Sequence, residues 1–159
     1  MPNLDPNGAP PGYYYKAGRT AYVIDPAGTY SVAGATAPTT DPAGTFSGRG
    51  ASAPTLAKGG TYIPVAGATS AAAEIVDPAG TYSRAGASAP TIDPAGTYSS
   101  AGATAPTKAA AGTYIPVTGA TSAAAQIVDA AGTYSPAGAS TPTTDLAGTY
   151  SGQVLIKGW

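Results

Sequence analysis

The chain has 159 residues and a formal net charge of −1, from seven basic and eight acidic residues, and it contains neither His nor Cys. Their absence excludes His-based acid–base catalysis, thiol nucleophiles, disulfides and metal sites built on His or Cys. Ala, Gly, Thr, Pro and Ser make up 108 residues, whereas Leu, Ile, Val and Phe number only 19. So few large apolar residues cannot build an ordinary globular core, and only periodicity distinguishes an ordered repeat from a disordered linker.

Signals for several functional classes are missing from the sequence. There is no Gly-rich phosphate loop, the basic residues are scattered, and no apolar stretch is long enough to span a bilayer. We therefore expect no enzyme activity, no nucleic-acid binding and no membrane insertion. The opening residues, MPNLDPNGAPPG, do not match a signal peptide, so we expect a fragment or a protein exported by another route.

An aromatic residue recurs at regular intervals. From Tyr30 to Tyr150 the spacings are 16, 16, 20, 16, 16, 20 and 16 residues, which predicts tandem units with a higher-order period of 52. We expect these rings to form a structural ladder. The unit boundaries are 9–24, 25–40, 41–56, 57–76, 77–92, 93–108, 109–128, 129–144 and 145–159. The ladder consists of Tyr14, Tyr30, Phe46, Tyr62, Tyr82, Tyr98, Tyr114, Tyr134 and Tyr150.

These units predict one repeat domain over residues 1–159. Residues 1–24 form a divergent N-terminal cap, 25–144 the core repeats and 145–159 a C-terminal cap, because the ends of a repeat array need polar or specialised units.

The 16-residue units read D-P-A-G-T-Y-S-x-A-G-A-[ST]-A-P-T-x. Residues 25–28, Asp-Pro-Ala-Gly, predict a type I turn that begins at Asp25, whose side chain accepts a backbone N–H. Residues 29–31 predict a short extended segment with the ring on one side and both hydroxyls on the other. Gly34 predicts a second bend, after which residues 35–39 are extended.

Two extended segments and two bends in each unit predict an all-β fold. The first interpretation is a tandem-repeat β-solenoid of nine units, with a thin core of stacked rings and Ala. The alternative is a linear array of small β-hairpins, which the Pro in the second half of each unit favours because it interrupts one ladder.

The 20-residue units, 57–76 and 109–128, lose the turn Asp and gain Ile-Pro-Val and Ile-Val. We expect the four extra residues to form an arc, with one helical turn at 71–74 and at 123–126. The arc is expected to cover the core with apolar side chains, because Ile and Val stabilise burial more than Ala does. These side chains are Ile63, Val65, Ile75, Val76, Ile115, Val117, Ile127 and Val128.

The segment DPAGTYSVAGATAPTT at 25–40 resembles the short cysteine-rich repeats of the ephrin-receptor-like extracellular type, which run C-P-A-G-T-Y-S-x-x-G-A-x-x-C-x-x-C. The resemblance implies an extracellular repeat array of bacterial surface type, although the disulfides of that family are absent here. A second resemblance is to bacterial ice-nucleation repeats, which also use a 16-residue step. The family cysteines fall on Asp25 and Pro38, Asp41 and Pro54, Asp77 and Pro90, Asp93 and Pro106, and Asp129 and Pro142.

A Thr-x-Ser pair recurs beside the ring. Spaced by one strand separation, such hydroxyls match what an ice-ordering surface needs, and the rings could bind sugars. The structural interpretation is that Thr and Ser are surface residues compatible with β-structure. These ligand candidates are Thr29, Ser31, Thr45, Ser47, Thr81, Ser83, Thr97, Ser99, Thr133, Ser135, Thr149 and Ser151.

The turn Asp residues occur in pairs one unit apart. Two close carboxylates repel one another, so a cation such as Ca²⁺ could bridge them, although the turn role already explains each Asp. They are weak metal candidates, and we otherwise expect no cofactor. The residues are Asp25, Asp41, Asp77, Asp93, Asp129 and Asp145.

The sequence thus predicts a non-catalytic structural repeat of a secreted or cell-surface protein, such as a stalk, an adhesin spacer or a fibre-forming module. The alternative is ice or carbohydrate binding through the repeated face. Self-association with further copies is expected, because exposed sheet edges and open repeat ends favour it.

Overall fold

The computed structural model describes residues 8–16 and 21–148. Within these ranges the protein is all-β, as predicted: its regular elements are two-residue strands and two short 3₁₀ helices. No helix in this part of the chain is long and apolar enough to cross a membrane. Predictions for Thr149, Tyr150, Ser151 and most of the C-terminal cap lie outside the described residues.

The elements in chain order are β1 (Tyr13–Tyr14), β2 (Val23–Ile24), β3 (Thr29–Tyr30), β4 (Thr39–Thr40), β5 (Thr45–Phe46), β6 (Thr55–Leu56), β7 (Thr61–Tyr62), η1 (Ala71–Ala73), β8 (Ile75–Val76), β9 (Thr81–Tyr82), β10 (Thr91–Ile92), β11 (Thr97–Tyr98), β12 (Thr107–Lys108), β13 (Thr113–Tyr114), η2 (Ala123–Ala125), β14 (Ile127–Val128), β15 (Thr133–Tyr134) and β16 (Thr143–Thr144).

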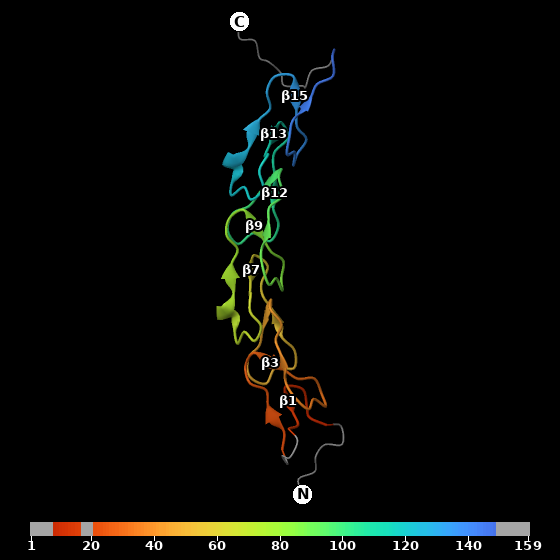
Figure 1. The fold of residues 1–159 in the computed structure, drawn as a ribbon, viewed down its shortest axis with the longest axis vertical. Helices are drawn as coiled ribbons and strands as arrows, with labels where there is room; N and C mark the ends of the chain where they lie inside the picture. The colour runs from red at the N-terminus through yellow and green to blue at the C-terminus, as the bar shows by residue number, and fades with distance from the viewer. Residues whose placement is uncertain (1–7, 17–20, 149–159) are drawn as a thin grey trace. The chain divides into compact units, whose positions relative to one another are not determined.

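Consecutive strands pair into antiparallel hairpins (Figure 1). In the hairpin of residues 25–40, Thr29 pairs with Thr40 and Tyr30 with Thr39. Pro38 directly precedes the second strand, and because it has no N–H to donate, the ladder stays short. The described residues therefore form repeated small antiparallel hairpins, the arrangement expected as the alternative to a solenoid.

The first turn of each unit differs from the prediction. The N–H of Thr45 donates to the carbonyl oxygen of Pro42 at 3.1 Å, and Gly44 has φ of +86°. Pro is therefore the first residue of the turn and Gly the third, where a type II turn requires a positive φ. The predicted type I turn starting at Asp is wrong by one residue, because Gly supplies the left-handed conformation that the turn needs.

The second bend is confirmed. Gly34 has φ of +78°, and the N–H of Ala35 donates to the carbonyl oxygen of Val32 at 3.2 Å. Gly138 has φ of +84° at the equivalent position, and the N–H of Ala139 donates to the carbonyl oxygen of Pro136. The tips of these two hairpins thus use the same glycine-dependent turn that precedes the first strands.

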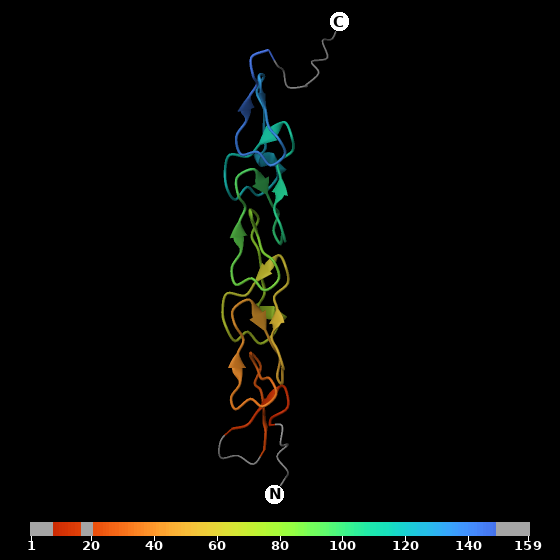
Figure 2. The ribbon, with the colours of Figure 1, turned by 90° about the vertical axis from the view of Figure 1, so that its right-hand side faces the viewer.

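The chain divides into two compact units, Met1–Asp77 with Ser83–Pro90 and Pro78–Tyr82 with Thr91–Trp159. The hairpin of residues 77–92 contributes to both units. Within each unit the hairpins follow one another in chain order (Figure 2). The single repeat domain over 1–159 remains a prediction.

In each of the two compact units, the same four backbone hydrogen bonds join one hairpin to the next. In the first unit the bonds run from the N–H of Gly28 to the carbonyl of Ser47 (2.9 Å), Ser31 to Ala51 (3.1 Å), Asp41 to Gly28 (3.0 Å) and Gly50 to Asp25 (3.0 Å). In the second unit they run from Gly96 to Ile115 (2.8 Å), Ser99 to Ala120 (3.1 Å), Ala109 to Gly96 (2.8 Å) and Gly119 to Asp93 (2.9 Å). The tip of each hairpin in these sets therefore lies along the first strand of the hairpin before it.

The turn glycines also approach the hairpin two places further along the chain. A Cβ added to Gly28 would lie 2.3 Å from the carbonyl oxygen of Gly67, and a Cβ added to Gly80 would lie 2.3 Å from that of Gly119. No described atom lies within 4 Å of a Cβ added to Gly132. Three successive hairpins therefore meet at each of the first two glycines, and no larger residue fits there.

The small apolar core has two parts, one in each 20-residue hairpin. Ile63 is fully buried with Ala57 and Ala68, and Ile115 with Ala109 and Ala120. The predicted helical turns are present as η1 and η2. However, the expected apolar cover is wrong for six of its members, because the strands and loops that carry them face outward. These exposed residues are Val65, Ile75, Val76, Val117, Ile127 and Val128.

Candidate functional site

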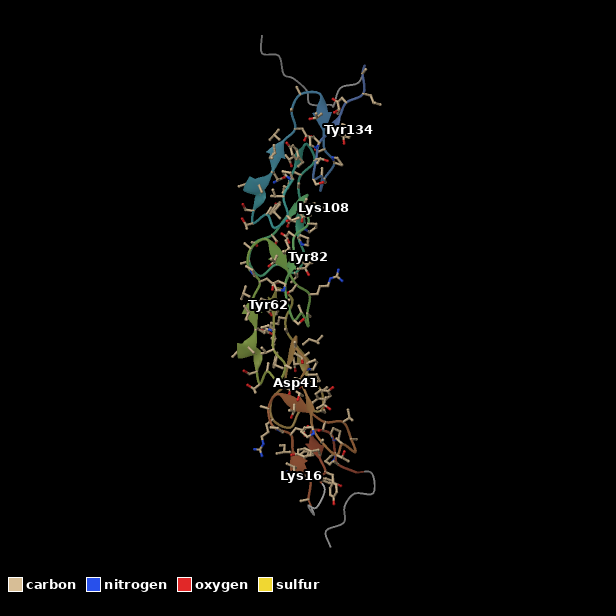
Figure 3. All side chains as sticks on the ribbon, viewed as in Figure 1. Lys16, Asp41, Tyr62, Tyr82, Lys108 and Tyr134 are labelled. Carbon is tan, nitrogen blue, oxygen red and sulfur yellow. The ribbon has the colours of Figure 1, made fainter. Side chains whose placement is uncertain are left out.

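The aromatic residues occupy equivalent positions at the ends of the first strands, and Figure 3 labels Tyr62, Tyr82 and Tyr134 among them. Phe46 and Tyr98 pack against the two apolar clusters of the hairpins that follow them. Between described rings, the face or edge contact found is that of Tyr15 with Tyr22, at 6.4 Å between centroids. The expected stack of rings is therefore wrong among the described residues. Parallel backbone bridges instead join four of the aromatic residues to an Ala of the next hairpin: Tyr30–Ala51, Phe46–Ala68, Tyr82–Ala103 and Tyr98–Ala120.

The Thr members of the Thr-x-Ser pairs use their hydroxyls locally. Each donates to the carbonyl oxygen three residues earlier, as Thr45 does to Pro42 at 2.8 Å. The bond adds to the backbone bond that closes the same turn, so these hydroxyls fasten the turn to the strand. Thr61 and Thr113 of the 20-residue hairpins make the same bond although no Ser follows them. We call the whole series the inner threonines: Thr29, Thr45, Thr61, Thr81, Thr97, Thr113 and Thr133.

The Ser members are buried, because the neighbouring hairpin covers their side of the strand. Ser47 donates from Oγ to the carbonyl oxygen of Thr29 at 3.0 Å, in the preceding hairpin. Ser83 and Ser99 make the same bond to Thr61 and Thr81. These hydroxyls are not part of an exposed face. The buried members are Ser31, Ser47, Ser83, Ser99 and Ser135.

The turn aspartates are the most unusual polar residues of the structure. Asp25, Asp41, Asp77 and Asp93 are fully buried (Figure 3 labels Asp41). The expected acceptance of a backbone N–H within the turn does not occur: one oxygen of Asp25 accepts from Ser31, and neither oxygen of the other three aspartates has a hydrogen-bond partner among the described residues. An unpartnered buried polar group costs about 1–3 kcal/mol.

The number of unpartnered oxygens on each Asp depends on where the Ser six residues later donates its hydrogen bond. Ser31 donates to Oδ1 of Asp25 at 2.9 Å, and Ser135 to Oδ1 of Asp129 at 2.7 Å. Each of these two aspartates has one unpartnered oxygen, Oδ2. Where Ser donates to the preceding hairpin instead, both oxygens of the Asp lack a partner, as in Asp41, Asp77 and Asp93.

The 20-residue hairpins fill the same two positions with apolar side chains. Ala57 replaces the Asp and Ile63 the Ser, and both are fully buried. Ala109 and Ile115 repeat the exchange in the second unit. Sequence reasoning noted the lost Asp and the gained Ile separately, but not that they meet in space. The signal was present, because the two positions change together in both 20-residue hairpins.

The described residues do not bring together a set of ligands for the predicted metal site. Within residues 8–16 and 21–148, no three His, Cys, Asp or Glu side chains come together as a metal group. Asp145 is half-buried, and its N–H donates to the carbonyl oxygen of Gly132. Calcium binding therefore remains a prediction without a described set of ligands.

The second strands carry an exposed edge that sequence reasoning did not single out. In five of the 16-residue hairpins the residue directly after the Pro that precedes the second strand is an exposed Thr. That Thr pairs through its backbone with the aromatic residue of the first strand, as Thr39 does with Tyr30. We call this series the outer threonines: Thr39, Thr55, Thr91, Thr107 and Thr143. The recurring Pro-Thr dipeptide was the signal.

The hydroxyl and carboxylate groups of the repeated hairpins thus bond to the backbone, pair with one another as Ser31 does with Asp25, lie buried without a partner, or are exposed on the second strands. A comparison of the chain with protein-family models and with curated proteins finds no match.

Proposed function

We propose that this protein is a non-catalytic structural repeat of a secreted or cell-surface protein, serving as a stalk, an adhesin spacer or a fibre-forming segment. The observation that carries the proposal is the recurrence of the same four backbone hydrogen bonds between successive hairpins in each unit. Such bonds join neighbours without requiring a large apolar core, which suits a chain with so few large aliphatic residues.

In its finer form, the proposal is that the hairpins stack in the manner of a β-solenoid, each adding one layer. The single-residue parallel bridges between hairpins support this stacking. The apolar clusters at Ile63 and Ile115 lie one 52-residue period apart and reinforce every third layer. Stability is then a sum of intrinsic and neighbour contributions, as in other repeat proteins.

Deletion of one period tests the structural role. Removing residues 77–128 joins hairpin 57–76 to hairpin 129–144, which has the same repeat class as the hairpin it replaces. We expect a cooperative thermal transition by far-UV circular dichroism to persist. The control removes residues 77–102, which deletes one hairpin and truncates the hairpin of residues 93–108, and it should weaken the transition. A featureless coil for the intact chain would overturn the proposal.

The alternative function is recognition of ice or carbohydrate by a repeated face. Half-buried rings and exposed hydroxyls support it, but the buried Ser residues leave less of the expected array at the surface. Ice-recrystallisation and glycan-array measurements on the folded protein discriminate the two. Activity that disappears when outer threonines are replaced by Val supports recognition, and no activity rejects it.

The partner that we propose is a further copy of the same repeat, bound by self-association. Backbone N–H and carbonyl groups at the end of a hairpin array favour pairing with another chain. Sedimentation velocity over a range of concentrations tests this proposal. A single monomeric species at every concentration would reject it.

A further inference from the structure

The outer threonines share an environment that the inner threonines lack. All five are exposed, and all five lie on the second strand of a 16-residue hairpin. Among the described residues their hydroxyls make no hydrogen bond. They are therefore free nucleophilic oxygens on an accessible edge, whereas every inner threonine hydroxyl donates to a backbone carbonyl.

The Pro before each outer threonine keeps this edge accessible. Pro38 has no N–H, so it cannot extend the hairpin ladder, and it disfavours helix at the residue before it. Thr36, two residues before Pro38, is also exposed, and its hydroxyl is likewise free. The hairpin of residues 25–40 thus presents accessible hydroxyls on both sides of Pro38, with Thr36 in a bend and Thr39 in the second strand.

The 20-residue hairpins interrupt this pattern. At the position that pairs with the ring, Ile75 and Ile127 replace Thr. Two of their exposed threonines, Thr69 and Thr121, each lie between an Ala and a Ser and not next to a Pro. The chain therefore contains exposed threonines of two kinds, which differ in the Pro beside them.

We propose that the outer threonines are acceptors for O-glycosylation, taking an N-acetylhexosamine from a uridine-diphosphate sugar through a polypeptide glycosyltransferase. Ser- and Thr-rich segments with Pro are the compositional signature of O-glycosylated stalks. Sugars on these positions would cover the exposed edges that otherwise favour association. The inference does not rest on the structural role proposed above, because acceptor activity depends only on the exposed segment.

The transfer balances as a substitution at the anomeric carbon. The threonine oxygen forms a bond to that carbon, and the bond from the carbon to the phosphate oxygen breaks. The uridine diphosphate leaves with the electron pair, and the hydroxyl proton passes to a base of the transferase or to solvent. No oxidant or reductant is required.

The experiment incubates the folded, full-length protein with uridine-diphosphate N-acetylgalactosamine and a broad-specificity polypeptide transferase. Mass spectrometry with electron-transfer fragmentation then maps occupancy at each site. We expect the outer threonines to exceed both the inner threonines and Thr69 and Thr121 by on the order of tenfold. No transfer, or equal transfer at the three groups, overturns the proposal.

A pair of variants separates the role of Pro from that of exposure. Pro38→Ala should lower occupancy at Thr36 and Thr39 by on the order of tenfold and leave Thr91 unchanged. The control, Pro26→Ala, changes the Pro of the turn before the first strand. It should leave the occupancy of Thr36 and Thr39 unchanged. Far-UV circular dichroism checks that both variants stay folded. Unchanged occupancy at Thr39 in folded Pro38→Ala contradicts the role assigned to Pro.

Discussion

The hairpins of residues 41–56 and 57–76 adjoin one another and solve the same packing problem with opposite chemistry. The first buries Asp41 without a partner for either carboxylate oxygen, and the second buries Ala57 and Ile63 at the equivalent positions. Burying an Ile side chain contributes about 1.5–3 kcal/mol, whereas an unpartnered polar group costs about 1–3 kcal/mol. The comparison teaches that stability is unevenly distributed, with every third hairpin supporting two weaker ones.

The largest expected effect comes from giving the apolar hairpin the residue of its neighbours. Ile63→Ser removes the largest buried side chain of its cluster and leaves a cavity against Phe46. We expect the free energy of unfolding to fall by about 3–5 kcal/mol, measured by urea denaturation. Val65→Ser, at an exposed position of the same loop, should change it by about 0.5 kcal/mol or less. Equal effects at both positions would contradict the assigned core.

The second test concerns contact between the two kinds of hairpin. Gly80→Ala places a Cβ against the carbonyl oxygen of Gly119, whereas Gly132→Ala meets no described atom. Both glycines have φ close to +80°, so the backbone strain is matched. We expect Gly80→Ala to lower the thermal midpoint more than Gly132→Ala does. The difference corresponds to an additional loss of about 1–3 kcal/mol in the free energy of unfolding. Similar losses would show that the backbone approach is not limiting.

The third test compares two of the buried turn aspartates. Asp41→Ala removes two unpartnered oxygens, and Ser47 keeps its bond to the carbonyl of Thr29. We expect a gain of about 1 kcal/mol in the free energy of unfolding. Asp25→Ala also removes the acceptor of Ser31, which leaves a buried hydroxyl without its partner.

Asp25→Ala should therefore gain less than Asp41→Ala, or lose stability. Both are measured by urea denaturation at one fixed pH. If both variants lose stability equally, the buried carboxylates have favourable contacts that this explanation omits.

The smallest expected effect separates inner from outer threonines. Thr45→Val removes the hydroxyl that donates to the carbonyl of Pro42 and should cost about 1 kcal/mol. Thr55→Val lies on the exposed edge of the same hairpin and should be close to neutral, since Val also suits a strand. Thermal melts of the two variants in parallel supply the measurement. A greater loss for Thr55→Val would reverse the assignment of the two series.

The second glycine bend and the short helical turns could be predicted from the sequence, and the hairpins were predicted as the alternative to a solenoid, because each depends on local residue chemistry. The face of each strand that is covered could not. Alternation predicts Thr29 and Ser31 on one side of the strand and Tyr30 on the other, but not which of them is buried. The tip of the next hairpin lies beside this strand, where the N–H of Ser31 donates to the carbonyl oxygen of Ala51, and Ser31 is buried.

The coupled exchange of Asp with Ala and of Ser with Ile was missed for a related reason. The two positions are six residues apart and become neighbours only through the turn and the first strand. The type II turn was missed because Pro and Gly suit more than one turn type, and the choice depends on which residue takes the positive φ.

The approach of Gly28 to Gly67 has a consequence for how the chain folds as it is made. Because each such glycine is covered by the hairpin two places further on, a hairpin completes its contacts only after two more have been synthesised. The smallest nucleus is thus three hairpins, about one 52-residue period. A pair of hairpins is expected to open readily, and further growth of the array adds one hairpin at a time to a template already formed.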